Sequence, residues 1–320
     1  MSNIKKELLY EMLTKMLKIR YFEEQIDKLY MKGEVHGTGH LYIGQEATAI
    51  GAILALKKED VITSTHRGHG HCIAKGADIN LMMAELLGKK DGYCKGKGGS
   101  MHIADINIGN LGANGIVGGG IAIATGAALA IKEMKTNQVV LCFFGDGAIN
   151  QGVFYESANM ASIWKLPVIY VVENNKYGMG FPVSKAVNID KLSKRADAFG
   201  IKGITIDGND AVGVYDTLSG LISEARSGSG PIIVECETYR WKGHSRVDPE
   251  RYRTRQEVEL WKKKCPILRF KKYLTDNNLI TSADIEKIEK DVASQIIKAT
   301  EFAMASPFPD PREATEDVYA

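Results

Sequence analysis

The sequence predicts an α/β fold, a doubly wound and mostly parallel sheet with helices on both faces, and three observations lead to it. Near-continuous apolar runs rich in β-branched and aromatic residues recur through the middle of the chain. Segments of helical periodicity separate these runs, as crossover helices separate parallel strands. Two of the runs end in the polar turns GDG and NN, which contribute nothing to a core. A parallel sheet that is buried on both faces, with loops at its edge, accounts for all three.

The first 120 residues predict helices joined by glycine-rich loops. Apolar side chains recur at helical spacing from Leu9 to Leu29, which is typical of a helix that docks on a core. The predicted elements are a helical arm over residues 1–32, a loop over 33–44, a helix from 46, a short strand near 61, a histidine-rich loop over 66–76, a helix over 80–87 and a glycine-rich loop over 92–120. Ordering the last loop costs conformational entropy, so we expect something to be bound there.

From residue 121 onward, helices and strands alternate. The predicted elements are helices over 121–134, 153–164 and 210–226, a further segment over 192–199, and strands over 139–144, 167–172, 203–206 and 231–237. A polar stretch, RWKGHSRVDPERYRTRQE, then leads to a helical extension over 260–320. Its longest helix is predicted over 284–304, with Thr281 or Ser282 as N-cap. We expect residues 1–320 to form one domain with these two helical additions.

The composition argues against several classes of protein. The 320 residues carry 41 Lys and Arg against 39 Asp and Glu, and this balance indicates neither a nucleic acid partner nor a membrane surface. The five cysteines are scattered and form no CxxC pair, so we expect reduced thiols in a cytoplasmic protein. No export signal and no apolar run of about 18 residues is present, so no membrane insertion is expected.

Polar side chains follow two successive strands of the predicted sheet. GDGAINQG begins at Gly145 and ENNKYGMG at Glu173. Loops that follow neighbouring parallel strands emerge at the same edge, about 5 Å apart, so the carboxylate of Asp146 should meet the amides of Asn174 and Asn175. Such hard oxygen donors suit Mg²⁺, which usually also binds phosphate oxygens of a ligand.

These observations predict a diphosphate held through magnesium, with glycines that allow the backbone to approach it. The alternative is that GDG and NN are ordinary turns, because Gly, Asp and Asn are common turn residues. That alternative explains each motif alone, but it does not explain their pairing across one strand–helix–strand unit.

The surrounding sequence resembles a known family. GDG followed by NN at this separation is similar to the thiamine-diphosphate-binding motif. The segment GDGAINQGVFYESANMASIWKLPVIYVVENNKYGMG resembles the alpha subunit of the first component of pyruvate dehydrogenase complexes. The segments STHRGHGHCIAKG, GKGGSMHIADINIG and LGANGIVGGG resemble the alpha subunit of bacterial acetoin dehydrogenase. The resemblance covers most of the chain and implies the diphosphate-type thiamine-diphosphate-binding fold, with thiamine diphosphate and Mg²⁺ as cofactors.

The resemblance also implies roles for residues that match the family motifs. Asp146 and Asn175 would bind the metal through side-chain oxygens, and Tyr177 through its backbone carbonyl. Gly147 and Ala148 would line the diphosphate.

Three further segments carry cofactor-binding residues by the same resemblance. His66 and Arg67 stand where pyruvate enzymes have Tyr-Arg, a pair that reaches the diphosphate, and an arginine fork suits phosphate. Gly115 and Val117 match backbone positions that contact the aminopyrimidine ring. His244 completes the expected set of cofactor contacts.

The histidines are the expected catalytic residues. His40 and His244 match family positions near the substrate, where an imidazole stabilises charge or moves protons. His69 and His102 remain candidates, whereas His36 and His71 are interpreted as surface or hydrogen-bonded spacer residues. No HExxH or His/Cys spacing predicts a zinc site.

The resemblance implies that this chain acts only with partners. In the family, the glutamate that activates the cofactor lies on a pyrimidine-binding domain of a beta subunit, and the usual assembly has two alpha and two beta subunits. The acyl unit passes to a lipoyl group on a second component. The loop with His244 and Ser245 resembles an active-site lid, and its arginines are expected either to be solvated or to contact the partner.

Several other functions were weighed. A nicotinamide dehydrogenase would need GxGxxG and a nucleotide hydrolase a Walker A motif, and neither motif occurs complete. A non-catalytic scaffold subunit would predict the loss of Asp146 or Asn175, and both are present. The expected reaction is decarboxylation of pyruvate or cleavage of acetoin, with a branched-chain 2-oxo acid dehydrogenase as the alternative within the family.

Overall fold

A five-stranded parallel sheet forms the centre of the molecule. The computed structural model describes residues 4–35 and 37–316. The strands, in their order across the sheet, are β1 (Val61–Thr63), β2 (Val140–Gly145), β3 (Val168–Asn174), β7 (Ile232–Glu237) and β6 (Lys202–Asp207). All neighbouring pairs are parallel. The predicted α/β class and parallel sheet are therefore confirmed.

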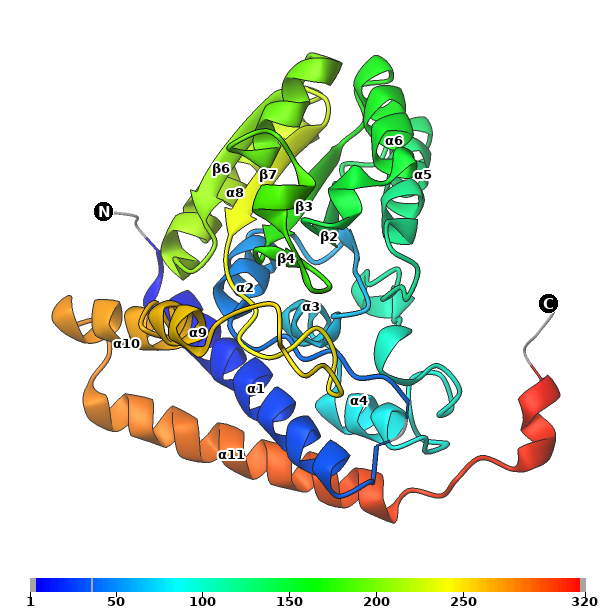
Figure 1. The fold of residues 1–320 in the computed structure, drawn as a ribbon, viewed down its shortest axis with the longest axis vertical. Helices are drawn as coiled ribbons and strands as arrows, with labels where there is room; N and C mark the ends of the chain where they lie inside the picture. The colour runs from blue at the N-terminus through cyan, green and yellow to red at the C-terminus, as the bar shows by residue number, and fades with distance from the viewer. Residues whose placement is uncertain (1–3, 36, 317–320) are drawn as a thin grey trace.

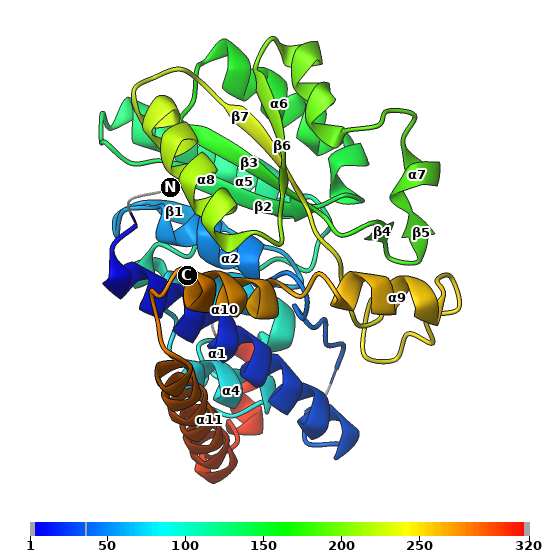
Figure 2. The same cartoon turned by 90° about the vertical axis from the view of Figure 1, so that its left-hand side faces the viewer.

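Helices cover both faces of the sheet (Figures 1 and 2). The helices are α1 (Lys6–Met31), α2 (Glu46–Leu54), α3 (His69–Lys75), α4 (Ile79–Leu86), α5 (Gly119–Glu133), α6 (Gly152–Ile163), α7 (Val183–Ala186), α8 (Ala211–Arg226), α9 (Arg255–Lys262), α10 (Pro266–Asp276) and α11 (Ser282–Ala305). One core contains α1, α2 and α8, and the other contains α5 and α6. Alternate residues of β2 enter the two cores: Leu141 and Phe143 face the first, and Cys142 and Phe144 the second.

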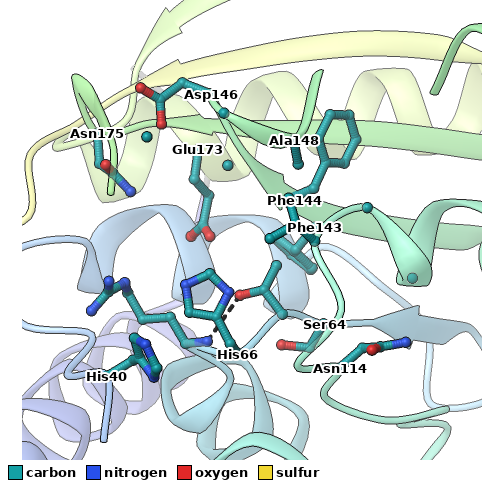
Figure 3. A pocket seen from close by; sticks show the side chains of 18 of the residues that line it. His40, Ser64, His66, Asn114, Phe143, Phe144, Asp146, Ala148, Glu173 and Asn175 are labelled. Carbon is teal, nitrogen blue, oxygen red and sulfur yellow. Dashed lines mark hydrogen bonds between the residues drawn. The ribbon is translucent and has the colours of Figure 1, made fainter. Parts of the chain in front are cut away.

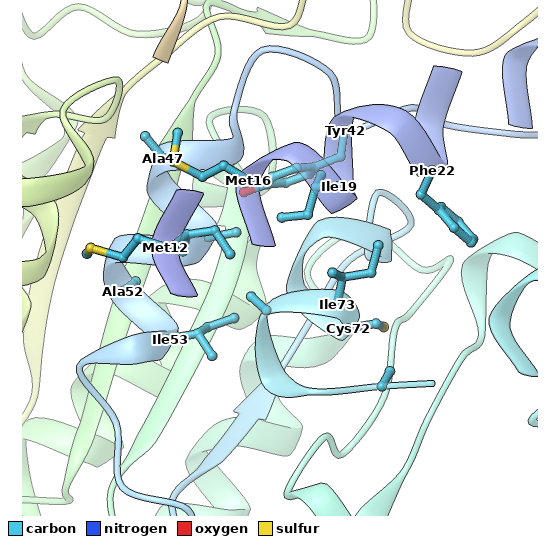
Figure 4. Close-up of a cluster of buried hydrophobic side chains, with 14 of the residues drawn as sticks. Met12, Met16, Ile19, Phe22, Tyr42, Ala47, Ala52, Ile53, Cys72 and Ile73 are labelled. Carbon is cyan, nitrogen blue, oxygen red and sulfur yellow. The ribbon is translucent and has the colours of Figure 1, made fainter. Parts of the chain in front are cut away.

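The N-terminal helix is an integral part of the first core. Met12, Met16, Ile19 and Phe22 lie along one side of α1 and are fully buried with residues of α2 and α3 (Figure 4). Helix α11 packs against α1 and α4. It begins with a capping box in which Thr281 and Asp284 exchange hydrogen bonds, as the predicted N-cap requires.

Short elements complete the chain. They are the hairpin strands β4 (Tyr177–Gly178) and β5 (Phe181–Pro182) and the 3₁₀ turns η1 (Gly99–Met101), η2 (Ile106–Ile108), η3 (Ala148–Asn150), η4 (Leu192–Phe199) and η5 (Pro311–Thr315). All five cysteines are free thiols. No helix in the described ranges is both long and apolar enough to cross a membrane.

One expectation for the first 120 residues was wrong, and part of another segment is ordered by a contact that the sequence did not reveal. Part of the segment expected to be a histidine-rich loop is the buried helix α3, because its histidines are hydrogen-bonded inside the core. The glycine-rich loop is ordered around a side chain of the same chain. The carboxylate of Glu85, which is fully buried, accepts hydrogen bonds from the backbone N–H groups of Cys94, Gly96, Gly98 and Gly99 at 2.7–2.9 Å.

Four neighbouring strands send their following loops to one edge of the sheet. These are β1, β2, β3 and β7, and their carboxyl ends lead to His66, Asp146, Asn175 and His244 respectively. Ligands of open α/β sheets bind beyond the carboxyl ends of the strands. The topology therefore brings segments from four parts of the sequence together.

Candidate active site

A cavity of about 420 Å³ lies at this edge of the sheet (Figure 3). Every residue to which the family resemblance assigned a role lines it: His40, His66, Arg67, Gly115, Val117, Asp146, Gly147, Ala148, Asn175, Tyr177 and His244. Asn174, which was expected to meet Asp146 together with Asn175, lies outside this lining and donates instead to Glu235 Oε1 at 2.6 Å. Figure 3 shows Asp146 and Asn175 on one side, His40 and His66 on the other, and Glu173 between them. The volume and the mixed lining are typical of a site for a small organic ligand.

Two oxygen atoms at the ends of β2 and β3 are buried without partners. Asp146 is 2% exposed and Asn175 is 8% exposed, and neither Asp146 Oδ2 nor Asn175 Oδ1 has a hydrogen-bond partner in the described part of the chain. Leaving such atoms dry and unpaired costs about 1–3 kcal/mol each, and more for a charged group. A cation that accepts both oxygens would remove this cost, so the donors fit a magnesium ion.

The charge and orientation of this pair follow from their neighbours. Burial raises the pKa of the Asp146 carboxyl to about 6, and the nearby Arg240 guanidinium opposes part of that rise. Asn175 Nδ2 donates to Gln45 Oε1 at 3.1 Å, which turns the Asn175 carbonyl oxygen away from Gln45. Gln45 is fully buried and fixes the orientation of the Asn175 amide. The sequence analysis did not assign Gln45 to the site.

Arg240 holds the backbone of the second loop in place. Its guanidinium donates to the carbonyls of Tyr177 at 3.4 Å and Met179 at 2.8 Å, and to the Tyr252 hydroxyl at 2.8 Å. The bond to Tyr177 is long, and a carbonyl oxygen has a second lone pair for another partner. The Tyr177 ring points elsewhere, since its hydroxyl donates to Glu257.

Gly147 is required by the approach of the two loops to each other. A Cβ atom on Gly147 would lie 3.2 Å from the Cα of Gly178, and a Cβ atom on Gly178 would lie 3.2 Å from the Cα of Gly147. A side chain at either position would require the loops to separate by a few tenths of an ångström. Ala148 follows and opens the turn η3, which leads into α6 at the same edge.

The glycine-rich segment before α5 supplies the wall that carries Gly115 and Val117. Asn114 Oδ1 accepts a hydrogen bond from the Ile116 N–H at 2.8 Å, and Gly118 has φ of 82°, a left-handed conformation that favours glycine. Val117 is 51% exposed, so about half of its surface is uncovered in this chain.

Three histidines form a cluster on the opposite wall. The ring centroids of His40 and His66 are 4.6 Å apart, and those of His40 and His244 are 4.9 Å apart. Arg67 joins the segments that carry them, because it donates to the carbonyls of Leu41 and His244 at 2.6 and 2.8 Å. Burial, and next the Arg67 charge, lowers the pKa of all three rings, to about 3, 2 and 4 for His40, His66 and His244.

The remaining histidines lie outside the cavity lining. His69 is buried in α3, where Nδ1 contacts the Glu23 carboxylate at 3.1 Å and Nε2 pairs with Ser100 Oγ at 3.0 Å. His102 is exposed, and its Nδ1 bonds the Gly98 carbonyl at 2.9 Å. His36 lies outside the described residues.

His71 and Glu173 form a buried network below the cavity. His71 Nδ1 pairs with Ser64 Oγ at 2.8 Å, and its Nε2 lies 3.2 Å from Glu173 Oε1. The Tyr42 hydroxyl donates to the same carboxylate. Glu173 lines the cavity, although the sequence analysis did not assign it a role. The available signal was its position one residue before the asparagine pair, at the end of a buried strand.

Comparisons with known proteins agree with this geometry. A family model described as "Dehydrogenase E1 component" matches residues 14–312. The chain is 49% identical over 312 residues to the alpha subunit of acetoin:2,6-dichlorophenolindophenol oxidoreductase of Bacillus subtilis, with 96% of this chain and 92% of the relative covered. The corresponding subunit from Cupriavidus necator is 43% identical, over 98% of this chain and 95% of the relative. The alpha subunit of the pyruvate dehydrogenase E1 component of Rickettsia bellii is 42% identical, over 95% and 93%.

These matches span nearly the whole chain, and they include the loops that converge at the cavity. The resemblance noted for GDG and NN therefore extends over the entire fold. The chain belongs to the dehydrogenase E1 component family, and it is an alpha subunit of a thiamine-diphosphate-dependent oxidoreductase of the pyruvate and acetoin dehydrogenase type.

Proposed function

We propose that this chain binds the diphosphate of thiamine diphosphate through Mg²⁺ at the ends of β2 and β3. Asp146 and Asn175 supply side-chain oxygens, and Tyr177 supplies its backbone carbonyl. The observation that carries the proposal is a pair of buried oxygens, Asp146 Oδ2 and Asn175 Oδ1, for which the described residues provide no hydrogen-bond partner. Three protein oxygens leave positions for water and phosphate, which is how Mg²⁺ is usually bound in enzymes.

The rest of the cofactor contacts come from the other walls of the cavity. Gly147 and Ala148 line the diphosphate, and the positive charge of Arg67, with His66, faces it from the β1 loop. In the present conformation Arg67 donates to two backbone carbonyls, which supports a role through its charge more than through a fork on phosphate. The backbone at Gly115 and Val117 contacts the aminopyrimidine ring.

The reaction uses the histidine cluster for proton handling. When bound, thiamine diphosphate supplies a nucleophilic thiazolium carbon and an electron sink for cleaving a C–C bond next to a carbonyl. His40 and His244 are neutral at pH 7 because their pKa values are lowered to about 3 and 4, so each ring carries a hydrogen-bond donor at one nitrogen and an acceptor at the other. His244 also contacts the cofactor in this proposal. Both rings stand at the wall opposite the proposed metal ligands.

The substrate is acetoin or pyruvate. Acetoin is cleaved to acetaldehyde and an acetyl unit, whereas pyruvate loses CO₂ and leaves the same two-carbon unit, which passes to a lipoyl group on an acyltransferase component. The relative at 49% identity is named for acetoin, and the pyruvate dehydrogenase subunit is 42% identical. This difference supports acetoin as the first substrate to test.

A beta subunit completes the active site and supplies the activating glutamate, in an assembly of two alpha and two beta subunits in the cytoplasm. Apolar side chains near the cavity support a covering partner. Ile116 is 75% exposed, Met179 67% and Phe181 55%. Contiguous exposed apolar side chains commonly mark a protein interface.

Co-expression with the beta subunit tests this function. Dye-linked turnover is measured with acetoin, pyruvate and branched 2-oxo acids, with and without thiamine diphosphate and Mg²⁺. We expect turnover of acetoin or pyruvate that requires both cofactors. Turnover of branched 2-oxo acids alone would contradict the proposed substrate, and turnover without thiamine diphosphate would contradict the proposed chemistry.

A further inference from the structure

Three imidazoles from distant segments meet at one wall of the cavity. The coordinating atoms of His40, His66 and His244 all lie within 4.8 Å of one another. His40 is 5% exposed, and its Nδ1, like that of His244, is buried with no hydrogen-bond partner in the ranges that the structure describes. A buried ring nitrogen without a partner has lost its hydration and gained nothing in return. The cluster therefore contains ring nitrogens that are free to coordinate a metal ion.

The segments carrying these rings are already fixed relative to one another. Arg67 follows His66 and bonds the carbonyl of Leu41, next to His40, and the carbonyl of His244. Asp248 adds a second anchor, since its carboxylate accepts a hydrogen bond from the backbone N–H of His244 at 2.6 Å. Ligands held in place by the backbone lose less entropy when they bind an ion.

We propose that His40, His66 and His244 form a binding site for a zinc-class divalent cation whose fourth coordination position is open to the cavity. Three imidazoles with one open position are a common ligand set for zinc. Nitrogen donors favour Zn²⁺, Co²⁺, Ni²⁺ and Cu²⁺ over Mg²⁺, so this site is chemically distinct from the oxygen donors Asp146 and Asn175.

The geometry and charge of the cluster suit such an ion. Zinc–nitrogen bonds of about 2.0–2.1 Å place tetrahedral ligand atoms about 3.4 Å apart. The present separations are within 4.8 Å, so ring rotations that close them by up to about 1.4 Å complete the set. The rings are neutral at pH 7 because burial lowers their pKa values, and the neutral ring is the form that binds metal.

The neighbouring charges oppose the ion, and acidic groups reduce this opposition only in part. Arg67 and Arg240 face the cluster and oppose a cation. Glu173 attracts Arg67, Asp146 attracts Arg240, and Asp248 lies close enough to His244 to raise its pKa in opposition to the arginines. The ion therefore meets a local field that stays net positive, and the nitrogen donors must overcome it.

An ion at this site would occupy lone pairs that the proposed function assigns to proton transfer, so it would inhibit turnover. The site itself does not rest on the proposed function, because it needs only the three imidazoles. Metal binding and turnover can accordingly be measured separately, and either can fail without the other.

Cobalt titration of the full chain without a histidine tag tests the site. Saturating Mg²⁺ is present so that Co²⁺ does not enter the oxygen donors. We expect one equivalent of Co²⁺ to give the intense visible absorption of tetrahedral cobalt, and Zn²⁺ to remove it; octahedral oxygen sites absorb weakly. The variants His66→Phe and His244→Asn should each lower cobalt affinity at least about 100-fold, since even outer-shell changes cost about 10–100-fold.

His102→Gln is the matched control, because it removes an exposed histidine that lies outside the cluster. We expect it to bind Co²⁺ like the unaltered chain. Circular dichroism melting shows whether each variant is folded. If one cluster variant does not fold, the cobalt affinity of the other cluster variant tests the site. Absence of the intense band in the unaltered chain, or its persistence in a folded cluster variant, would overturn the proposal.

Discussion

At the scale of single residues, the site is defined by buried polar atoms that have no hydrogen-bond partner within residues 4–35 and 37–316. Asp146 and Asn175 could be selected from the sequence because a parallel sheet places the loops of neighbouring strands at one edge. Gln45 and Glu173 could not be selected in the same way. Their roles depend on which side chains they meet, and those contacts join positions that are 130 and 131 residues apart, Gln45 with Asn175 and Glu173 with Tyr42.

Gln45 should act as a positioning residue for the metal ligand. In Gln45→Met the Asn175 amide loses the acceptor that orients it, so Mg²⁺ affinity should fall about 10–100-fold, as for other outer-shell partners of metal ligands. Calorimetric titration of Mg²⁺ with thiamine diphosphate measures the change. Gln138→Met, at the opposite end of β2, should leave the affinity unchanged. Equal Mg²⁺ affinities in Gln45→Met and Gln138→Met would show that Gln45 does not position the metal ligand.

Asp146 predicts how metal affinity depends on pH. Its pKa is raised to about 6, so protons compete with metal below that pH, and Mn²⁺ affinity measured without cofactor should fall by up to about tenfold per pH unit. The raised pKa also means that the folded chain holds this proton more tightly than the unfolded chain. The resulting stability is fully present below about pH 4 and is lost as the pH rises through 6. Asp146→Asn should abolish the dependence on pH, and an unchanged slope in that variant would assign it to another group.

At the scale of elements, the hairpin β4–β5 depends on a buried arginine. Arg240 is 2% exposed and binds two of the hairpin's carbonyls, yet the sequence shows it only as the first arginine of a polar stretch. The expectation that Arg253 is solvated or contacts a partner was also wrong, because this residue is buried and donates to the carbonyls of Arg240 and Trp241. Charged residues in a sequence give no sign of burial when their partners are backbone carbonyls.

Arg240→Met should lower the free energy of unfolding by about 2–4 kcal/mol, because it leaves buried carbonyls unpaired. Urea denaturation measures the loss. Arg269→Met is the control, since Arg269 is half-exposed and its ion pairs with Asp207 and Asp210 should contribute less than about 1 kcal/mol. A loss no larger in Arg240→Met than in the control would show that the hairpin does not need this residue.

Periodicity predicted the long helices and the sheet strands well, but it did not identify α3. The sequence HGHCIAK has too few apolar residues to show a helical face, and its histidines are buried through hydrogen bonds. Periodicity also gave no sign of what orders the first part of the glycine-rich loop. Its order comes from the buried Glu85 carboxylate, a long-range contact that composition does not reveal.

At the scale of the whole molecule, strand order determines which segments share the site. The order β1-β2-β3-β7-β6 places four strand ends beside one another, and each brings one wall of the cavity. The sequence predicted the pairing of β2 and β3, because they are consecutive. It did not predict that His40, His66 and His244 would form one cluster, since their spacing along the chain matches no known metal motif.

The melting temperature of the complex with its beta subunit tests the central claim, that a divalent ion joins Asp146 and its neighbours to a diphosphate. Mg²⁺ and thiamine diphosphate at about 100 times the dissociation constant should stabilise the folded complex by about 2.7 kcal/mol and raise its melting temperature. Asp146→Ala should abolish this rise, whereas the exposed Asp190→Ala should preserve it. A full rise in Asp146→Ala would contradict the account.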